Sequence, residues 1–489
     1  MDKQEKFYVT TPIYYVTDAP HIGNTYPTVA ADIIARWHRL RGEKVFFLTG
    51  TDEHGEKVQK AADAAKEEPK VFVDKISLRY KEAWKTLGIS YDKFIRTTDP
   101  EHLDAVARFI SKLVENGDVY KGQYEGWYCV PDESFFTELQ LKDGKCPDCG
   151  REVKKVKEDS YFFKLSKYQD RLLELYDKNE DFLSPKLRRQ EVINRVKGGL
   201  KDVSMTRTTV KWAVPFPGDK DHFVYVWVDA LINYISALGW PDGTFKVFWP
   251  ADVHIVGKEI NWFHSVIWPA MLMSAGIELP AMIFAHGWWT SEGKKMSKSL
   301  GNFVDPVSLS SKYSVDAIRY VLMREMPFGE DGDFSEESLK ARINGELVAD
   351  LGNLVYRVLT LAEKFDGKFD GSADLEKHLD VVGIDESMDR LDYYGALEKI
   401  WAFIRSSNKY INDNKVWSLK GAEMSNALYN LLEACRICSI LLYPFMPDTA
   451  QSIAQQLGVE MGTLKDCKFG AFTGKPKRGK MLFEKVLTK

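Results

Sequence analysis

Residues 7–49 read FYVTTPIYYVTDAPHIGNTYPTVAADIIARWHRLRGEKVFFLT, and this stretch decides the fold. Residues 7–11 are all β-branched or aromatic, which predicts a strand. Residues 26–40 carry apolar side chains at helical spacing, and residues 44–49 form a second, nearly continuous apolar run. A strand, a helix and a strand in succession predict a βαβ unit in a parallel sheet that is buried on both faces.

The rest of the chain extends this α/β pattern, interrupts it and then leaves it. The pattern resumes in the apolar run at residues 224–228 and continues through 252–257, a helix at 260–275 and a buried strand at 282–285. Beyond about residue 339 the strand signals vanish, and amphipathic stretches at 339–364, 388–412 and 424–442 predict a helix bundle. We therefore expect a Rossmann-type parallel-sheet domain in two halves (1–116 and 223–290), an inserted domain (117–222), a loop region (291–338) and an all-α domain with a C-terminal tail (339–489).

The composition limits the setting in which the chain works. With 489 residues and 44% hydrophobic side chains, it can bury the cores of roughly two to four domains. A net charge of −4 gives no global positive field, and the basic run at 475–489 is either a local patch for a polyanion or a solvated tail. The N-terminal residues are charged and lack the apolar core of a signal peptide. No apolar run approaches the ~20 residues of a membrane span, and six cysteines do not make a disulfide scaffold. We expect a cytoplasmic protein with no membrane partner.

Two segments that lie far apart in the sequence are suited to hold a polyphosphate. His21 and Gly23 stand where the first strand gives way to the helix, and helix N-termini favour phosphate because their backbone N–H groups point outward. Residues 293–299 read GKKMSKS, a loop whose Lys295 and Lys298 could neutralise charge that develops on a pyrophosphate leaving group. Taken singly, an ordinary turn and a solvated loop are the alternatives.

Together the two segments resemble the nucleotide signatures of class I aminoacyl-tRNA synthetases, and nearly the whole chain looks like a bacterial-type methionyl-tRNA synthetase. Residues 21–24 (HIGN) match the first signature, with Asn24 where other class I enzymes often have His, and residues 295–299 (KMSKS) match the second. The resemblance implies a ligase with a Rossmann-type catalytic domain, a connective insertion and an anticodon-binding helix bundle. It assigns catalysis to His21, Lys295 and Lys298, and ATP binding to His21, Gly23, Asn24, Gly257, Lys258, His286, Lys295, Met296, Ser297, Lys298 and Ser299.

The implied reaction has two steps. The carboxylate of L-methionine attacks the α-phosphorus of ATP, which is accompanied by Mg²⁺, and methionyl-adenylate and pyrophosphate are formed. The terminal adenosine hydroxyl of tRNA(Met), initiator or elongator, then attacks the activated carbonyl. Neither step requires a protein nucleophile, so catalysis would consist of positioning and charge stabilisation, with Lys298 acting on the first transition state.

A methionine pocket must be apolar and able to contact a thioether, which packs favourably against aromatic rings. Aromatic residues are usually core, but segments 13–15, 226–230 and 260–265 align with those that form the pocket in the family. The resemblance places Tyr234 and His264 near the sulfur, and Tyr15 and Trp227 over the side chain. Asp52 matches the carboxylate that pairs with the substrate ammonium, since an unpaired buried charge is costly. The implied methionine-binding residues are Ile13, Tyr14, Tyr15, Asp52, Trp227, Ala230, Leu231, Tyr234, Ile260, Phe263 and His264.

Three residues of the expected helical domain match the anticodon readers of the family. Asn353 and Arg357 are four residues apart and share a helix face, and Trp417 follows a polar segment. Bases of a single-stranded loop are recognised by stacking and by hydrogen bonds to their exposed edges, which these side chains can supply. Val416 stands where the family usually has Pro before Trp417. The chain carries no obvious appended oligonucleotide-binding module of the kind that some members use to dimerise, so we expect a monomer.

The inserted segment contains a candidate zinc site. Cys146 and Cys149 have the spacing of a metal knuckle, and zinc sites are often built from two such pairs. Members of the family frequently add a second Cys-x-x-Cys, whereas this chain has Cys129 followed by Asp132. The fourth ligand is therefore Asp132, another group or absent, and structural Zn²⁺ and cysteines without a metal are both open. Another Cys-x-x-Cys, at 435–438, lies in an apolar helical run and predicts core packing.

Three other functions are weaker interpretations of the same residues. A class I synthetase for a branched aliphatic amino acid or cysteine is disfavoured by the aromatic pocket and by the lack of a large editing insertion. A smaller nucleotidyltransferase is disfavoured by the long helical C-terminal part. A tRNA-binding protein without catalysis is disfavoured because His21, Asp52 and Lys298 are all present.

Overall fold

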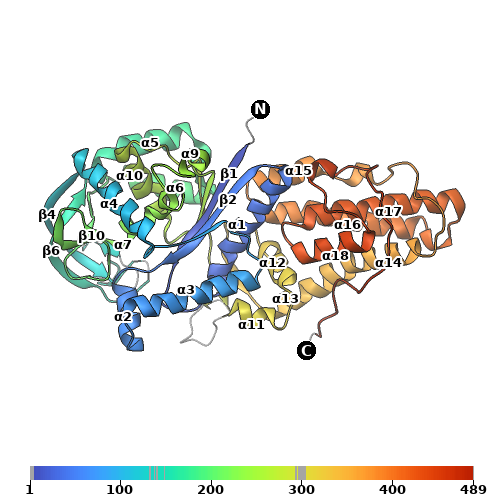
Figure 1. The fold of residues 1–489 in the computed structure, drawn as a ribbon, viewed down its shortest axis with the longest axis horizontal. Helices are drawn as coiled ribbons and strands as arrows, with labels where there is room; N and C mark the ends of the chain where they lie inside the picture. The colour runs from blue at the N-terminus through green and yellow to red at the C-terminus, as the bar shows by residue number, and fades with distance from the viewer. Residues whose placement is uncertain are drawn as a thin grey trace.

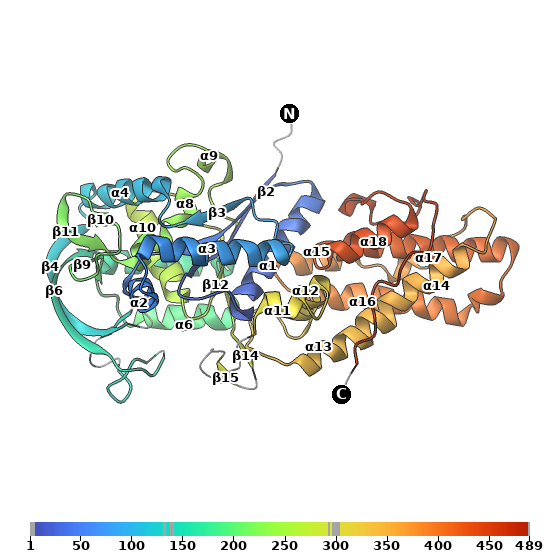
Figure 2. The same ribbon diagram turned by 60° about the horizontal axis from the view of Figure 1, so that its bottom comes forward.

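The computed structural model describes residues 5–130, 134–136, 138, 141–147, 149–291, 294–295 and 304–487. The molecule is elongated, with the sheets and their helices at one end and the C-terminal helices at the other (Figure 1). Helix α1 (Ile22–Arg41) lies at the boundary between the two parts in both ribbon views (Figures 1 and 2). The arrangement of elements around α1 therefore decides how the two parts meet.

A six-stranded parallel sheet forms the centre of the larger part. Its strands are ordered β3-β2-β1-β12-β13-β7. From β1 the chain moves outward to β2 and β3, and it later returns to the other side of β1 with β12 and β13. The β1–β12 pair is thus the topological switch point, where ligands bind outside the carboxyl ends of strands. The strands are β1 (Lys6–Tyr15), β2 (Lys44–Asp52), β3 (Lys93–Arg96), β7 (Leu183–Ser184), β12 (Val253–Gly257) and β13 (Met282–His286).

Side chains of the central strands alternate between the two faces of the sheet, and both faces are buried. Val9 and Phe47 point into a core shared with α1 and α3, whereas Tyr8 and Leu48 point into a core shared with α4 and α10. All four side chains are fully buried. The first of these cores continues into the C-terminal helices, so the two parts of the molecule share apolar packing. The helices are α2 (Glu56–Ala65), α3 (Pro69–Thr86), α4 (Pro100–Glu115) and α10 (Trp268–Ala275).

The segment predicted as an insertion contains two small antiparallel sheets. The curved sheet with order β5-β4-β6-β8 lies at the far end of the molecule, and a second sheet has the order β10-β11-β9 (Figure 2). The same segment supplies β7, the edge strand of the parallel sheet, through its pairing with β13. Its elements are β4 (Val119–Cys129), β5 (Ser134–Phe136), β6 (Lys154–Phe163), η2 (Leu165–Tyr168), α5 (Gln169–Lys178), η3 (Glu180–Phe182), α6 (Lys186–Lys197), β8 (Val203–Ser204), β9 (Thr206–Arg207), β10 (Pro215–Phe216) and β11 (Asp219–Val224).

The apolar run at residues 224–228 is a strand only as far as its first residue. Strand β11 ends at Val224, and helix α7 (Val226–Leu231) follows. The β-branched residues favour a strand, but Asp229 of this helix is bound by His54 Nδ1 at 2.7 Å and His102 Nε2 at 2.9 Å. This tertiary contact holds the segment as a helix. Two short helices complete the region, α8 (Asn233–Ser236) and α9 (Phe245–Phe248).

After β13 the chain forms a three-stranded sheet, β15-β14-β16, and from Glu336 onward the described residues form helices and loops without a strand. The predicted helix bundle is confirmed, and Cys435 and Cys438 are fully buried in it, as predicted. The elements are β14 (Trp289–Ser291), β15 (Lys294–Lys295), α11 (Pro306–Ser310), α12 (Val315–Arg324), β16 (Gly332–Phe334), α13 (Glu336–Arg342), η6 (Ile343–Gly352), α14 (Asn353–Ala362), η7 (Glu376–His378), α15 (Val381–Asp389), α16 (Tyr393–Asp413), η8 (Val416–Ser418), α17 (Gly421–Leu442), α18 (Pro447–Leu457) and η9 (Leu464–Asp466). Within the described ranges, no helix has both the length and the apolar character needed to cross a membrane.

Candidate functional site

A cavity of about 370 Å³ lies at the carboxyl end of the parallel sheet, beside the switch point. Its walls come from the ends of β1, β2, β12 and β13, from the first turns of α1, from α7, and from Asn233 and Tyr234, which follow α7. Most of the residues predicted to bind ATP or methionine therefore meet in one place, although they are spread over more than half of the chain. Those that line the cavity are Ile13, Tyr14, Tyr15, His21, Gly23, Asn24, Asp52, Trp227, Ala230, Leu231, Tyr234, Gly257, Ile260, His264 and His286.

The first signature forms the N-terminal turn of α1. The backbone N–H of Gly23 donates to His21 Nδ1 at 3.0 Å, and the N–H of His21 donates to Asn24 Oδ1 at 3.1 Å, so the two side chains cap the helix reciprocally. Because Nδ1 accepts this bond, a neutral His21 carries its proton on Nε2, which can donate to a ligand. A Cβ on Gly23 would lie 2.7 Å from His21 Cε1, so glycine is required beneath the ring. The turn thus presents an imidazole donor at the positive end of the helix dipole, which suits phosphate.

Aromatic rings form one wall of the cavity. Trp227 and Phe263 stack with ring centroids 4.1 Å apart, and Tyr15 meets Trp227 edge-on at 6.3 Å. Phe263 begins the π-helical turn η4 (Phe263–Ile267), a distortion that is frequent at functional sites. Phe263 does not itself line the cavity but packs against the face of the Trp227 ring. The wall is therefore apolar and rigid, as the binding of an unbranched apolar side chain requires.

Two polar groups in this apolar region satisfy each other. His264 Nδ1 donates to the carbonyl oxygen of Ile260 at 3.0 Å, so Nε2 of the neutral ring is an acceptor, and the Tyr234 hydroxyl donates to it at 2.6 Å. Burial lowers the pKa of His264 to about 4, which keeps the ring neutral near pH 7. Since the hydroxyl proton and both ring nitrogens are engaged, the Tyr234–His264 pair has no free donor to offer a polar side chain. A thioether, which is only a weak acceptor, fits such a wall.

Asp52 supplies a buried carboxylate to the cavity. It ends β2 directly beside Tyr15 of β1, with which it is in register, and it is 3% exposed. The next residue, Glu53, accepts from Arg96 Nε at 2.7 Å and Arg96 Nη2 at 2.9 Å, and this bidentate pair fixes the end of the strand. A fixed, buried anion of this kind can bind a substrate ammonium, because each charge satisfies the other away from water.

A second buried carboxylate, that of Asp229, fixes the helix that carries Trp227 of the aromatic wall. Burial alone would raise the pKa of Asp229, but the hydrogen-bonded His54 and His102 outweigh it and lower the pKa to about 2. His102 Nδ1 also lies 2.7 Å from the hydroxyl oxygen of Ser236. Asp229 is therefore a charged anchor that holds α7, and with it Trp227, against the sheet.

The end of β12 places Gly257 and Lys258 differently. Gly257 lines the cavity, whereas Lys258 does not: its Nζ donates to Asp331 Oδ1 at 2.7 Å and Oδ2 at 2.6 Å, and it lies over the Trp288 ring at 4.1 Å. Glu259 lines the cavity instead and accepts from Trp288 Nε1 at 2.6 Å. In this conformation Lys258, which the resemblance assigns to ATP, is engaged by a residue that follows the second signature.

The second signature lies largely outside the described residues. Met296, Ser297, Lys298 and Ser299 are not described, and Lys295 is described only through its backbone, which pairs with Thr290 in the β14–β15 hairpin. Because Thr290 lines the cavity, this hairpin begins at the edge of the site.

The cavity also contains residues that the sequence did not single out. Asn233 donates to the carbonyl of Ala230 at 2.6 Å, and its Oδ1 has no hydrogen-bond partner among the described residues. Asn233 and Glu259 stand next to the predicted residues Tyr234 and Lys258, so their position in these segments could have identified them. Trp288 had no such signal. The remaining lining residues are Pro12, Thr17, Asp18, Ala19, Tyr26, Pro27, Lys57, Tyr80, Gly287, Trp289 and Thr290.

Three cysteines converge at the end of β4. The sulfur atoms of Cys129, Cys146 and Cys149 lie within 4.8 Å of one another, and the Cys129 and Cys149 sulfurs are 3.5 Å apart. All six cysteines of the chain are described, and none forms a disulfide. Convergent thiols are the donors that structural zinc sites favour, so the three residues fit Zn²⁺. Asp132, one of the alternatives for the fourth ligand, lies outside the described residues.

The predicted anticodon readers lie in the C-terminal part, outside the residues that line the cavity. Asn353 begins α14 and Arg357 follows one turn later, where its Nη2 donates to Asn412 Oδ1 of α16 at 2.8 Å. Trp417 lies in η8, just after α16, and is 57% exposed, whereas Val416 before it is fully buried. The buried Val416 side chain packs this turn against the core. The Trp417 ring is accessible for stacking.

Comparison with known proteins supports both parts of the structure. The family described as "tRNA synthetases class I (M)" matches residues 7–157 and 151–359, and the "Anticodon-binding domain of tRNA ligase" matches residues 376–477. The methionine–tRNA ligase of Caldanaerobacter subterraneus subsp. tengcongensis is 50% identical over 505 residues, which cover 99% of this chain and 79% of the relative. That of Thermotoga maritima is 50% identical over 482 residues, which cover 93% and 76%.

Solved structures of a Mycobacterium tuberculosis methionyl-tRNA synthetase have the same fold. The complex with methionyl-adenylate matches with a TM-score of 0.93 at 41% identity and covers 98% of this chain and 100% of the solved one. The apo form matches with a TM-score of 0.86 at 38% identity and covers 99% of each chain.

Proposed function

The chain belongs to the class I methionyl-tRNA synthetases, and from this premise we propose that it activates L-methionine with ATP and transfers the methionyl group to tRNA. One observation carries the proposal: a single cavity joins a helix N-terminus suited to phosphate with an apolar, aromatic pocket that has a buried carboxylate. The helix N-terminus would bind the phosphate half of an aminoacyl-adenylate, and the aromatic pocket would bind its amino-acid half. Family membership also favours methionine over the branched aliphatic amino acids and cysteine, and a synthetase over a smaller nucleotidyltransferase or a non-catalytic tRNA-binding protein.

We propose the following roles for the first step. Asp52 pairs with the ammonium of methionine, the Trp227 wall holds the side chain, and the Tyr234–His264 pair faces the sulfur. His21 and Asn24 hold the phosphates at the start of α1, and the methionine carboxylate attacks the α-phosphorus as pyrophosphate leaves. The protein supplies position and charge rather than a nucleophile. Lys295 and Lys298 neutralise the charge that develops on the pyrophosphate leaving group, and the other residues that the resemblance assigns keep their expected roles.

We propose that the second step joins the cavity to the helical part. The terminal adenosine of tRNA(Met) would attack the methionyl carbonyl, while Trp417 stacks on an anticodon base and Asn353 and Arg357 bond to base edges. The exposure of Trp417 and the position of Arg357 one turn after Asn353 support this assignment. The use of both initiator and elongator tRNA(Met), the monomeric state and the cytoplasmic location are further proposals from the sequence.

Two metals fit the residues present. Mg²⁺ bound to ATP takes its ligands chiefly from phosphate oxygens and water, and the cavity offers the carboxylates of Asp18 and Glu259 nearby. Cys129, Cys146 and Cys149 would hold a structural Zn²⁺, which would tie the end of β4 to the knuckle loop. Protein prepared without chelators should contain about one equivalent of zinc, and Cys146→Ser should lose it. Less than about a tenth of an equivalent in the wild type would exclude the site.

The experiment that tests the function is ATP–pyrophosphate exchange with a panel of amino acids. Methionine should support exchange, while isoleucine, leucine, valine and cysteine should support far less, and tRNA should then accept methionine from the same enzyme. Exchange with another amino acid in preference to methionine would identify a different synthetase. Binding of tRNA without any exchange would identify a non-catalytic protein.

A further inference from the structure

Helix α1 connects the first signature with the C-terminal helices. Its first turn, at His21 and Asn24, lines the cavity, whereas its middle and end contact elements from far along the chain. The Tyr393 hydroxyl of α16 donates to the carbonyl of Ala30 at 2.9 Å, and farther along α1, Arg41 Nη2 donates to Asp385 Oδ1 of α15 at 2.6 Å. One helix therefore has its first turn in the candidate site and also contacts the helical part at Ala30 and Arg41.

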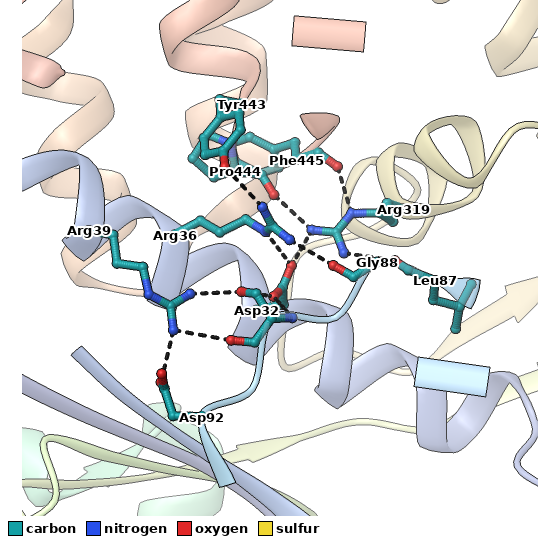
Figure 3. Close-up of polar contacts among 11 residues, drawn as sticks. Asp32, Arg36, Arg39, Leu87, Gly88, Asp92, Arg319, Tyr443, Pro444 and Phe445 are labelled. Carbon is teal, nitrogen blue, oxygen red and sulfur yellow. Dashed lines mark hydrogen bonds and ion pairs between the residues drawn. The ribbon is translucent and has the colours of Figure 1, made fainter. Parts of the chain in front are cut away.

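The strongest of these contacts is the buried pair of Asp32 and Arg319 (Figure 3). Arg319 belongs to α12, and its Nη2 donates to Asp32 Oδ2 at 2.7 Å; both side chains are 0% exposed. The other bonds of the guanidinium reach the carbonyls of Phe445 at 3.0 Å and Pro444 at 2.9 Å, between α17 and α18, and that of Leu87 at 3.3 Å, after α3. Arg319 thus joins α1 to three other segments at one point.

Arg36, one turn farther along α1, repeats the arrangement. Its Nε donates to Asp32 Oδ2 at 2.7 Å, its Nη2 to the carbonyl of Gly88 at 2.7 Å, and its Nη1 to the hydroxyl of Tyr443 at 3.3 Å (Figure 3). The two arginines therefore reach the same two neighbours, the segment after α3 and the segment between α17 and α18. A shift of residues 443–445 relative to α1 would break bonds to both.

The charge of Asp32 and the planar shape of the Arg319 guanidinium fix the geometry of their contact. Burial alone would raise the pKa of Asp32, but Arg319, Arg36 and the hydrogen-bonded Ser90 outweigh it and lower the pKa to about 2, so the carboxylate is charged. Ser90 donates to Asp32 Oδ1 through its N–H at 2.7 Å and its hydroxyl at 2.6 Å. A planar guanidinium can bond to a carboxylate and several carbonyls at once, whereas a lysine ammonium cannot span them. The position of α1 consequently depends on the shape of the guanidinium, and not only on its positive charge.

We propose that Arg319 and Asp32 are positioning residues for adenylate formation. Their contact fixes α1 against the helical part and thereby fixes the position of its first turn in the cavity. This inference rests on the proposed function and goes beyond it, because neither residue lines the cavity. Asp32 is eleven residues from His21, or about 16 Å along a helix that rises 1.5 Å per residue. A small tilt of α1 about Asp32 displaces the first turn, and an error of about 1 Å at a reacting group can lower a rate about 100-fold.

A backbone hydrogen bond at the start of α1 indicates which end of the cavity a displaced helix would disturb. The N–H of Ile22 donates to the carbonyl of Val304 at 3.1 Å, in the segment that follows the second signature. A displaced first turn would therefore disturb the phosphate end of the site and its contact with that segment. The methionine end would be disturbed less. Of its elements, β1 bonds to α1 through the Tyr14 hydroxyl, which contacts the Asn24 carbonyl at 3.1 Å and the Thr28 hydroxyl at 2.7 Å. Trp227 of α7 and His264 of η4 are instead held by Phe263, Tyr234 and Ile260.

The test is the conservative substitution Arg319→Lys in the full chain, assayed by methionine-dependent ATP–pyrophosphate exchange. We expect kcat/KM for ATP to fall by about 10- to 100-fold, and the Kd for methionine, measured by tryptophan fluorescence, to stay within about twofold. Asp32→Asn should show the same division between ATP and methionine. A purely structural role would lower both affinities, or the active fraction, together.

Arg436→Lys is the matched control. Arg436 is also buried and also joins a carboxylate, Glu433 at 2.7 Å, to two carbonyls, those of Asp466 at 2.8 Å and Lys468 at 2.6 Å. None of the hydrogen bonds that it makes among the described residues reaches α1. This variant should lose thermal stability to a similar degree and keep the ATP parameters of the wild type.

Tyr443→Phe keeps the test valid if Arg319→Lys does not fold. It removes one hydroxyl from the contact with Arg36 and should lower kcat/KM for ATP by about two- to fivefold, again with methionine affinity unchanged. Parallel changes in ATP and methionine parameters, the same division in Arg436→Lys, or wild-type ATP kinetics in a folded Arg319→Lys would overturn the inference. An inactive wild-type enzyme would instead reject the proposed function.

Discussion

The cavity and the predicted anticodon face are built in opposite ways. The cavity draws its walls from four strand ends and several helices, and its polar groups are buried in pairs such as Tyr234 with His264. The predicted anticodon face uses one turn of α14 and the turn after α16, and Trp417 is more than half exposed. A group in the cavity cannot be changed without altering its neighbours, whereas Trp417 can be removed with little effect on packing. Substitutions should therefore separate the two steps of the reaction cleanly.

The largest effect should come from Asp52→Ala. Removal of the carboxylate leaves the substrate ammonium buried without a partner, a cost of about 3–5 kcal/mol, so kcat/KM for methionine should fall about 1000-fold. Asp52→Asn, which keeps the shape, is the matched variant and should lose nearly as much. Both should keep a wild-type circular dichroism spectrum. Near-normal methionine-dependent exchange in Asp52→Ala would refute the assignment of Asp52.

Lys298→Ala should have the next largest effect, on rate rather than affinity. A cation aimed at charge that develops in the transition state contributes about 100-fold, so kcat for pyrophosphate exchange should fall by about that factor. The Kd for methionine should be unchanged, because Lys298 is assigned to the leaving group. Stopped-flow measurement of adenylate formation separates the two quantities. A variant that loses affinity alone would overturn this role.

Trp417→Ala should have a moderate effect that is confined to tRNA. Stacking of a base on an aromatic ring contributes about 1–3 kcal/mol, so KM for tRNA should rise about tenfold or more. Methionine-dependent exchange in the absence of tRNA should be unchanged, which serves as the internal control. Equal aminoacylation rates of variant and wild type at low tRNA concentration would contradict the comparison between the two regions.

The smallest effect should come from mild acid. Burial lowers the pKa of His264 to about 4, below the ordinary value of 6.5, so the neutral ring stabilises the fold above about pH 6.5, and this contribution is lost as the pH falls towards 4. The ring remains mostly neutral at pH 5.5, so the Kd for methionine should be nearly constant from pH 8 to pH 5.5 and should rise only below about pH 5. Fluorescence titration across this range checks it. A tenfold loss of affinity centred near pH 6.5 would show that His264 titrates as an exposed histidine.

The strands and helices that form the fold were largely readable because local pattern and final environment agree. Residues 7–11 are all β-branched or aromatic and residues 44–49 are nearly all apolar, as expected for strands covered on both faces, and they lie in β1 and β2. The exception is informative: residues 226–231 are rich in strand formers yet form α7, because His54 and His102 bind Asp229 from other elements. Tertiary contacts of a buried charged residue accompany this departure from local propensity.

Part of the candidate site could be predicted from the sequence. Motifs that are continuous in sequence, such as residues 21–24 and 295–299, could be identified from the chain, and the resemblance extended them to the segments around Trp227 and His264. Contacts between distant segments could not be identified in this way. Nothing local in the sequence indicates that Lys258 is held by Asp331, that Phe263 supports Trp227 rather than lining the cavity, or that Trp288 lies beside Glu259.

The order of residues was sufficient for the parallel sheet, the helix bundle and the family, since each depends on periodicity or on short motifs. The three-dimensional packing was needed for everything that depends on which atoms meet. It fixed the tautomer of His264, the capping of α1 by its own signature and the junction at Arg319, where a guanidinium from α12 binds a carboxylate on α1 and carbonyls near α17. Hydrogen bonds and buried charges are set by distance and direction in space, and residues 287 positions apart acquire these only when the chain has folded.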